Sequence, residues 1–185
     1  MASVVGIVNS ALIKLGADTI AALSEDSPEA RAANARYEAL RDEVLRAHPW
    51  NFALGRVELA RLVDAPAFGP ARQYQLPADC LRVLALDSEE AFEIEGNRLL
   101  TDADSARILY VRRVADPNLF DAMFRETLAL RIAADLAYKL VSSTTLAQSM
   151  MQLYREHLAL SRSADAQEGD GHRRISAELW LDARR

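Results

Sequence analysis

The chain has 185 residues, of which 50% are hydrophobic and 26% are charged, so it can bury the core of one domain and is too apolar for wholesale disorder. A net charge of −5 and a sequence pI of about 5.3 argue against a protein that grips nucleic acid through a large basic face. Its single cysteine, Cys80, excludes an internal disulfide framework and fits a reducing compartment.

The first predicted helix covers residues 4–15, where apolar residues recur at spacings of three and four. Ser3 can cap its start by accepting a backbone N–H, and Gly16 can end it in a left-handed turn. Because the apolar residues are periodic and no basic segment precedes them, we expect neither a signal peptide nor a membrane span here.

The second predicted helix follows Ser27, a good N-cap, and begins at Pro28, which suits the first helical position. It should stop at His48, because Pro49 disfavours the helical conformation in the residue before it. Steps of three and four align one narrow apolar seam for packing on another helix. The seam consists of Ala30, Ala33, Tyr37, Leu40, Val44 and Ala47.

The middle of the chain changes from helical to strand-like periodicity. "DAPAFGPA" (64–71) holds two prolines and a glycine and predicts a loop. In "FEIEGNRLL", apolar and acidic residues alternate up to Gly96-Asn97, a plausible two-residue hairpin turn. "CLRVLAL" and "RILYVRRV" are short and rich in branched residues. Residues 74–114 are therefore predicted to form a small antiparallel sheet of three or four strands.

Two more helices follow the predicted sheet. Asp121 can cap the third, in which Phe124, Leu128, Ile132, Leu136 and Leu140 lie four apart. Thr127, Arg131, Asp135 and Lys139 form a single polar stripe at the same spacing, so this helix is expected to be covered on its other sides and to be central. The apolar residues assigned to the fourth helix are Leu146, Met150, Leu153 and Leu160.

The predicted fold class is therefore mainly α: a bundle of about four helices with a small antiparallel β insert and an extended C-terminal tail. The bundle takes residues 3–62 and 116–163, and the insert takes 74–114, all within one domain, 1–165. The tail covers residues 166–185, and its first part, "DAQEGDG" (165–171), reads as a flexible linker.

Motifs that carry chemistry are weak in this sequence. The three histidines are scattered, and neither a phosphate-binding glycine loop nor a nucleophile elbow occurs. Cys80 is interpreted as a structural thiol, and Asp102 with Asp104 as a solvated turn rather than a calcium site. The remaining charged candidates, read as sheet-edge and strand-end charges rather than as catalytic or phosphate-binding groups, are Glu89, Glu90, Glu93, Glu95, Arg112 and Arg113. We expect no catalytic residue, no cofactor and no metal.

The stretch "HPWNFAL" joins the second helix to the insert. Pro49 stops the helix, and Trp50 and Phe52 follow at once. These aromatic residues could anchor a ligand, but large aromatic side chains mostly serve cores. We therefore interpret Pro49, Trp50 and Phe52 as a structural corner with Trp50 buried.

Three pieces of the chain, taken in order, resemble the head-to-tail adaptor family of tailed bacteriophages, called tail tubular protein A in short-tailed phages. They are "IVNSALIKLGADTIAALSEDSPEARAANARYEALRDEVLRAHPWNFAL", then "YQLPADCLRVLAL", then "ILYVRRVADPNLFDAMFRETLALRIAADLAYKLVSS". The run "RDEVLRAHPWNFA" followed by "Y-x-LP-x-DCLRV" carries most of the specificity. The resemblance covers most of residues 3–165. The loop 64–72, the hairpin 88–106 and the tail beyond 165 do not contribute to it.

The resemblance implies a structural subunit without a cofactor. Members of this family form a ring, dodecameric in most, beneath the portal protein of the virion and above the next tail component, a nozzle or tail-tube protein. DNA passes through the ring's lumen without specific binding, which suits an acidic subunit. The expected location is the head–tail junction of the virion, after assembly in the host cytoplasm, with no role for a membrane.

The tail offers the candidate partner-binding residues. The last fourteen residues hold four arginines, in one pair near each end, together with several apolar residues, a composition suited to docking in a groove with acidic borders. The residues assigned to binding the portal or a neighbouring subunit are Arg173, Arg174, Ile175, Leu179, Trp180 and Leu181. A tail that folds back on its own subunit is the alternative.

Two other functions stay open at this stage. One is a cell-wall hydrolase that uses a glutamate pair, for which Glu93 and Glu95 are the candidates. The other is a small helical DNA-binding module, which the acidic net charge disfavours.

Overall fold

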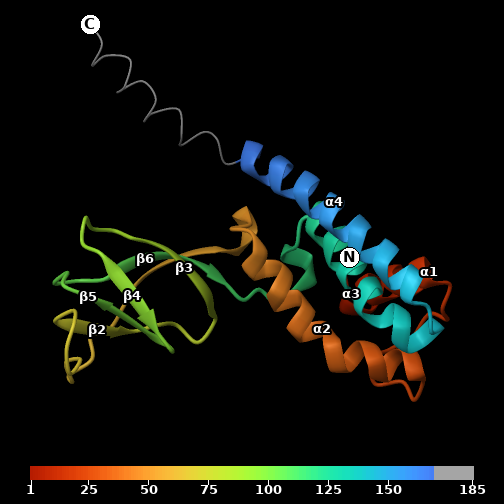
Figure 1. The fold of residues 1–185 in the computed structure, drawn as a ribbon, viewed down its shortest axis with the longest axis horizontal. Coiled ribbons are helices and arrows are strands. Elements are labelled where there is room, and N and C mark those ends of the chain that lie inside the picture. Colours follow the sequence, from red (N-terminus) through yellow and green to blue (C-terminus); the bar gives the residue numbers. More distant parts are fainter. Residues whose placement is uncertain (169–185) are drawn as a thin grey trace, which may run out of the picture. The chain divides into compact units, whose positions relative to one another are not determined.

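The computed structural model describes residues 1–168, which form four α-helices and six β-strands (Figure 1). The predicted combination of helices with an antiparallel β insert is thus confirmed in outline. The chain divides into two units. One is helical and comprises Met1–Val44 and the described residues from Asp116 onward. The other is mainly β and comprises Leu45–Ala115.

The first three of the four helices begin directly after the predicted capping residues Ser3, Ser27 and Asp121. The four are α1 (Val4–Leu15), α2 (Pro28–Ala47), α3 (Ala122–Val141) and α4 (Thr144–Glu168). Ser3 accepts a hydrogen bond from the Gly6 amide at 3.0 Å, and Asp121 accepts one from the Phe124 amide at 2.8 Å. Gly16 ends α1 with φ of +68°, in the left-handed region that glycine adopts without strain.

The third helix is the centre of the helical unit, as predicted. It packs along α4 and against α1 (Figure 1). Its polar stripe is only partly exposed, because Thr127 is fully buried and hydrogen-bonded, whereas Arg131 and Asp135 form the expected ion pair one turn apart at 3.6 Å. The buried residues of α3 are Phe124, Thr127, Leu128, Ala129, Leu130, Ile132, Ala133, Ala134, Leu136 and Ala137.

The apolar seam of α2 is buried at five of its six predicted positions: Ala30, Ala33, Tyr37, Leu40 and Val44. The sixth, Ala47, is half-buried. Beside the seam, two arginines join α2 to α3. Arg36 donates two hydrogen bonds to Asp135, and Arg131 donates two to Glu43.

The fourth helix departs from the prediction in its length. It runs on to Glu168, so residues 165–168 of the predicted linker are helical; no proline or glycine interrupts the chain before Gly169. Its buried face consists of Met150, Tyr154 and Ser161, whereas Leu153 and Leu160, two of the apolar residues by which we assigned this helix, are exposed. The remainder of the predicted tail, 169–185, lies outside the described residues.

The strands form two sheets rather than the single sheet predicted. In the first, β1 (Leu54–Glu58), β6 (Arg107–Arg112) and β3 (Cys80–Leu86) lie in the order β1-β6-β3. In the second, β2 (Arg72–Gln75), β5 (Arg98–Thr101) and β4 (Phe92–Glu95) lie in the order β2-β5-β4. All pairs are antiparallel. The predicted hairpin turn at Gly96-Asn97 joins β4 to β5, with Gly96 at φ +59°.

The sheet region also begins earlier in the chain than the predicted insert, 74–114. β1 falls within residues 3–62, which we assigned to the bundle, and β2 begins at Arg72. The sequence "LGRVE" contains a glycine and two charged residues and has little strand signal of its own. Its partner β6 lies about fifty residues later, so the pairing depends on tertiary contacts that no local pattern reveals.

Both sheets contribute to one apolar core in the β unit, formed by Leu59, Tyr74, Leu76, Leu99, Ala106, Ile108 and Tyr110. The Tyr74 hydroxyl donates to the carbonyl of Ala103 at 2.8 Å inside this core. Gly55 lies opposite Tyr110, and a Cβ at Gly55 would come within 2.8 Å of the tyrosine ring, so glycine is needed for this approach.

Among residues 1–168, none of the helices combines the length and the hydrophobicity that crossing a bilayer requires.

Candidate functional site

The corner at Pro49, Trp50 and Phe52 is built around a buried tryptophan. α2 ends at Ala47, and Trp50 is 0% exposed. The His48 ring meets the indole edge-on at a centroid distance of 4.9 Å, and the Phe52 ring stacks on it at 6.3 Å. The expected burial of Trp50 is confirmed, and it supports a structural interpretation of this corner.

The same corner is tied to the first sheet through the last turn of α2. The guanidinium of Arg46 donates a hydrogen bond to the carbonyl of Leu81 in β3. The Ala53 amide donates to the Trp50 carbonyl at 2.8 Å and closes the short helical turn Asn51–Ala53 that leads into β1. These bonds hold Arg46 and the short helical turn in place within the β unit.

An apolar groove on the helical unit is the strongest candidate for an interaction surface. Its volume is about 410 Å³, and α1, α3 and α4 all contribute to it. Leu130 and Met150 are buried in its floor, whereas Leu153 is 44% and Leu160 is 63% exposed. The complete lining is Lys14, Glu126, Leu130, Met150, Leu153, Glu156, His157 and Leu160.

The leucines face this groove because a polar cluster occupies the buried side of α4. Ser161 is 1% exposed, and its hydroxyl lies 2.9 Å from that of Thr127. His157 Nδ1 lies 2.9 Å from the Thr127 hydroxyl and 3.2 Å from that of Ser161. Adjacent residues on a helix point about 100° apart, so turning Ser161 inward carries Leu160 outward.

The geometry of this cluster serves to hold the helices together. The Thr127 hydroxyl donates to the carbonyl of Met123 at 2.8 Å, and that of Ser161 donates to the carbonyl of His157 at 2.8 Å. His157 Nδ1 lies within hydrogen-bond distance of both hydroxyl groups, so the three side chains form one polar network between α3 and α4. Ser161 is 1% exposed, so it lacks the access to a substrate that a nucleophile needs.

Charged residues border the groove. Lys14 and Glu126 form an ion pair at 2.8 Å across α1 and α3, and Glu156 accepts a hydrogen bond from Gln152 at 2.9 Å. Two carboxylates and one ammonium group give the rim one excess negative charge if His157 is neutral. The groove is thus an apolar channel with a weakly acidic border.

A second apolar surface lies on the loop that connects β1 and β2. Val63 and Phe68 are almost completely exposed. The end of this loop is held in place, since Asp102 accepts a hydrogen bond from the Ala71 amide at 2.7 Å and Arg72 pairs with Asp104. Asp102 and Asp104 are exposed, as expected of a solvated turn. In addition, their contacts with Ala71 and Arg72 hold the end of the loop.

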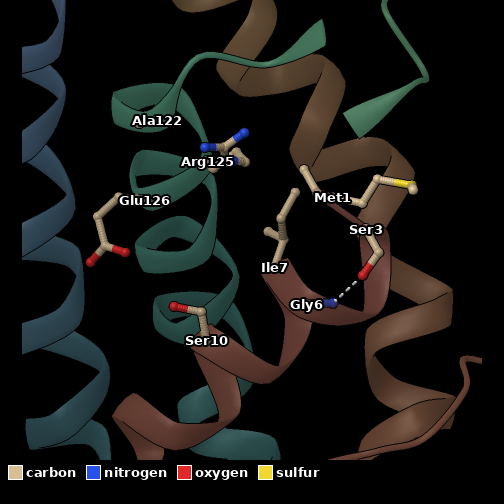
Figure 2. A pocket seen from close by; sticks show the side chains of 9 residues that line it. Met1, Ser3, Gly6, Ile7, Ser10, Ala122, Arg125 and Glu126 are labelled. Atoms are coloured by element: carbon tan, nitrogen blue, oxygen red, sulfur yellow. Dashed lines mark hydrogen bonds between the residues drawn. The ribbon is translucent and has the colours of Figure 1, made fainter. Parts of the chain in front are cut away.

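Another hollow lies where α1 and α3 begin (Figure 2) and has a volume of about 640 Å³. Figure 2 shows Arg125 on α3 near Ile7 on α1, with Ser3 capping Gly6. Helix N-termini and a guanidinium favour anions. However, Arg125 already donates to the Phe120 carbonyl at 3.1 Å, and Ser3 and Asp121 cap the two helices.

The other candidate groups occupy separate places in the β unit. Glu89, Glu90, Glu93 and Glu95 are exposed, the last two on the edge strand β4, as expected. Cys80 is half-buried against the β core, and burial raises the pKa of its thiol, which suits a structural role. Arg112 is not the solvated side chain we expected, because its Nε is buried. The described residues hold no group of three or more potential metal ligands.

The tail residues assigned to partner binding, Arg173, Arg174, Ile175, Leu179, Trp180 and Leu181, lie outside the described residues. The sequence analysis named Leu153 and Leu160 as apolar residues of the fourth helix and did not identify them as a binding surface. Their spacing of seven residues, which places them on one side of a helix, is the signal that could have done so. Comparison with protein-family models finds no matching family, and no curated protein matches the sequence.

Proposed function

We propose that this protein is the structural subunit of a head-to-tail adaptor in a tailed bacteriophage. Copies form a closed ring, twelve-fold by family resemblance, between the portal protein and the next tail component. DNA passes through the lumen, and the subunit acts without catalysis, cofactor or metal. The ring works at the head–tail junction of the virion after assembly in the host cytoplasm.

The observation that carries this proposal is the apolar groove on the helical unit. A monomer that works alone gains from burying Leu153 and Leu160, since each buried leucine side chain stabilises a protein by about 1.5–3 kcal/mol. α4 instead buries Ser161 and Tyr154 and leaves both leucines at the surface. Exposed apolar surface of this kind, with a polar rim, is typical of a protein–protein contact.

Two further features support a ring. A cyclic assembly uses heterologous contacts, so each subunit must present two different faces to its neighbours. The groove and the loop that carries Val63 and Phe68 are two such apolar surfaces, one on each unit. The net charge of −5 suits a lumen through which DNA slides without adhering.

The C-terminal residues 172–185 are proposed to secure the ring to the portal or to a neighbouring subunit. Deleting them should leave the melting temperature of the isolated chain nearly unchanged and abolish stable attachment to the portal. A truncated protein that melts much lower and still binds the portal would show that these residues belong to the subunit core.

The adaptor function is tested by mixing the purified chain with the portal protein of its own virion. Electron microscopy of the complex should show a closed ring on one face of the portal. The test variant is Leu160→Glu, which places a charge in the groove and should prevent ring closure. Its matched control is Arg155→Glu, which changes an exposed residue of α4 outside the groove and should leave the ring intact. Hydrolysis of purified cell wall, lost in Glu93→Gln or Glu95→Gln, would contradict the proposal.

A further inference from the structure

The dimensions and the charged border of the groove of α1, α3 and α4 indicate what kind of ligand fits it. Leu153 and Leu160 lie seven residues apart on α4 and therefore on the same side of the helix. Between Met150 and Leu160 the helix rises about 15 Å, at 1.5 Å per residue. The groove thus fits a short stretch of peptide with several apolar side chains rather than a single inserted residue.

The border of the groove favours a basic occupant. Glu126 and Glu156 flank it, and Lys14 is already paired with Glu126. A peptide that brings arginines to this border can pair with the carboxylates, because guanidinium groups form directed hydrogen bonds to carboxylates.

The chain itself contains a peptide of this composition. Residues 172–185, "HRRISAELWLDARR", hold four arginines and two acidic residues, so their side chains carry a net charge of +2, the difference of four and two. The apolar side chains are Ile175, Leu179, Trp180 and Leu181. Ile175 and Leu179 are four residues apart, the spacing by which peptides present anchors to a groove.

We propose that residues 172–185 of one copy bind the groove of the next copy, so that each subunit holds its neighbour. This inference rests on the proposed ring and names the contact that closes it. The segment and the groove are two different surfaces, as a cyclic, heterologous contact requires. The same pair of surfaces repeats at every junction, so no groove is left open in a closed ring.

The length of chain beyond α4 limits how far this contact can reach. The described helix ends at Glu168, and six residues, 169–174, precede Ile175. Fully extended, six residues span at most about 20 Å. In the proposed ring, a tether of this length keeps the segment at high local concentration near the neighbouring subunit.

Disulfide trapping in the full-length chain tests the contact. Cys80→Ala is the background, because Cys80 is the only native cysteine. One sample carries Leu153→Cys in the groove, and the other carries Leu179→Cys in the segment. The two are mixed without portal under a mild oxidant, and non-reducing electrophoresis with mass spectrometry measures the bond between them. We expect a disulfide that links the two different chains.

The control replaces the groove cysteine by Arg155→Cys, which is exposed on α4 outside the groove. Its cross-linking to Leu179→Cys should be at least tenfold lower. Equal trapping at both positions, or none at Leu153→Cys, would overturn the proposal. A chain carrying both Leu153→Cys and Leu179→Cys should form bonds mainly between copies. A bond formed mainly within one chain would overturn it as well.

The outcome is separable from that of the proposed function. Closed rings on the portal without the specific cross-link would refute this contact and leave the adaptor function standing. The specific cross-link without rings on the portal would refute the adaptor function and retain the contact.

Discussion

Arg36 on α2 and Asp135 on α3 form a two-point ion pair, in which Nε and Nη2 of the guanidinium donate to separate carboxylate oxygens at 2.8 and 3.1 Å. A second pair, Arg131 with Glu43, runs in the opposite direction between the same helices. Arg131 also approaches Asp135 at 3.6 Å, so four charges are linked in one network. This network borders the buried seam of α2.

Asp135→Asn should weaken the helical unit at neutral pH. The hydrogen bond and the charge of Arg36 hold the pKa of Asp135 below its usual value. We expect a loss on the order of 1 kcal/mol, because part of the network is exposed to solvent. Urea titration at pH 7 measures the loss. The control Asp26→Asn removes a pair with Arg31 in which the aspartate is almost fully exposed, and it should change the free energy of unfolding much less.

The contribution of Asp135 should also depend on pH. A carboxyl whose pKa is lowered in the folded state stabilises the protein above its unfolded pKa, about 3.9, and loses this effect as pH falls through the folded pKa. The difference between wild type and Asp135→Asn should therefore be constant from pH 5 to 7 and shrink below about pH 4. A difference that grows on acidification would contradict this account.

Two buried tyrosines should respond in opposite ways to loss of the hydroxyl. Tyr37 is buried, and its hydroxyl has no hydrogen-bond partner among the described residues, whereas Tyr74 donates to Ala103. Removing an unsatisfied polar group costs nothing, but removing one partner of a buried bond leaves the other unpaired. Tyr37→Phe should be neutral or stabilising, and Tyr74→Phe should cost about 1 kcal/mol or more by denaturant titration.

The same substitution at Tyr37 should alter alkaline unfolding. Burial raises the pKa of Tyr37 to about 12, above its usual 10. The folded state keeps its proton while the unfolded chain loses one, so stability falls as pH rises from about 10 to 12. Tyr37→Phe should have a shallower decline over this range. Identical declines in wild type and variant would show that Tyr37 is not buried as described.

Trp50→Ala should destabilise the protein by about 3–5 kcal/mol, as large aromatic truncations in cores do. The reason is its complete burial between His48 and Phe52. Phe68→Ala is the matched control, because Phe68 is almost fully exposed and its loss should change stability by less than about 0.5 kcal/mol. Equal small effects in denaturant titration would make Trp50 a surface anchor instead.

Adjacent residues of α4 offer a direct test of which face is buried. Ser161→Leu removes a buried hydroxyl from the cluster with Thr127 and overfills its site, so it should cost about 1–3 kcal/mol. Leu160→Ser should change the free energy of unfolding of the isolated chain by less than about 0.5 kcal/mol, since Leu160 is exposed. The reverse order of effects would show that the leucine stripe is the buried face of α4.

Much of the helical unit could be predicted because its signals are local. Ser3, Ser27 and Asp121 each accept the backbone hydrogen bond that a helix start requires, and the seam of α2 has one clear period. The sheets were harder to predict from the sequence. β1 pairs with β6 across about fifty residues, and the sequence of β1 is not strand-like.

The groove could not be predicted from periodicity alone. On α4 the leucines at 153 and 160 form one stripe, and Met150, Tyr154 and Ser161 form another about 100° away. Hydrophobicity alone favours the leucine stripe as the buried face of α4. The hydrogen bonds of Thr127, which sits on a different helix, make the other stripe the buried one.

The central claim is that this chain forms a closed ring on the portal, and microscopy of the portal-bound complex tests it most directly. Rotational averaging of end-on particle images gives the number of subunits without any assumption about the contacts between them. We predict a closed ring with twelve-fold symmetry beneath the portal, with an open lumen wide enough for duplex DNA. A monomer or a two-fold dimer on the portal, or no binding to it, would contradict the account.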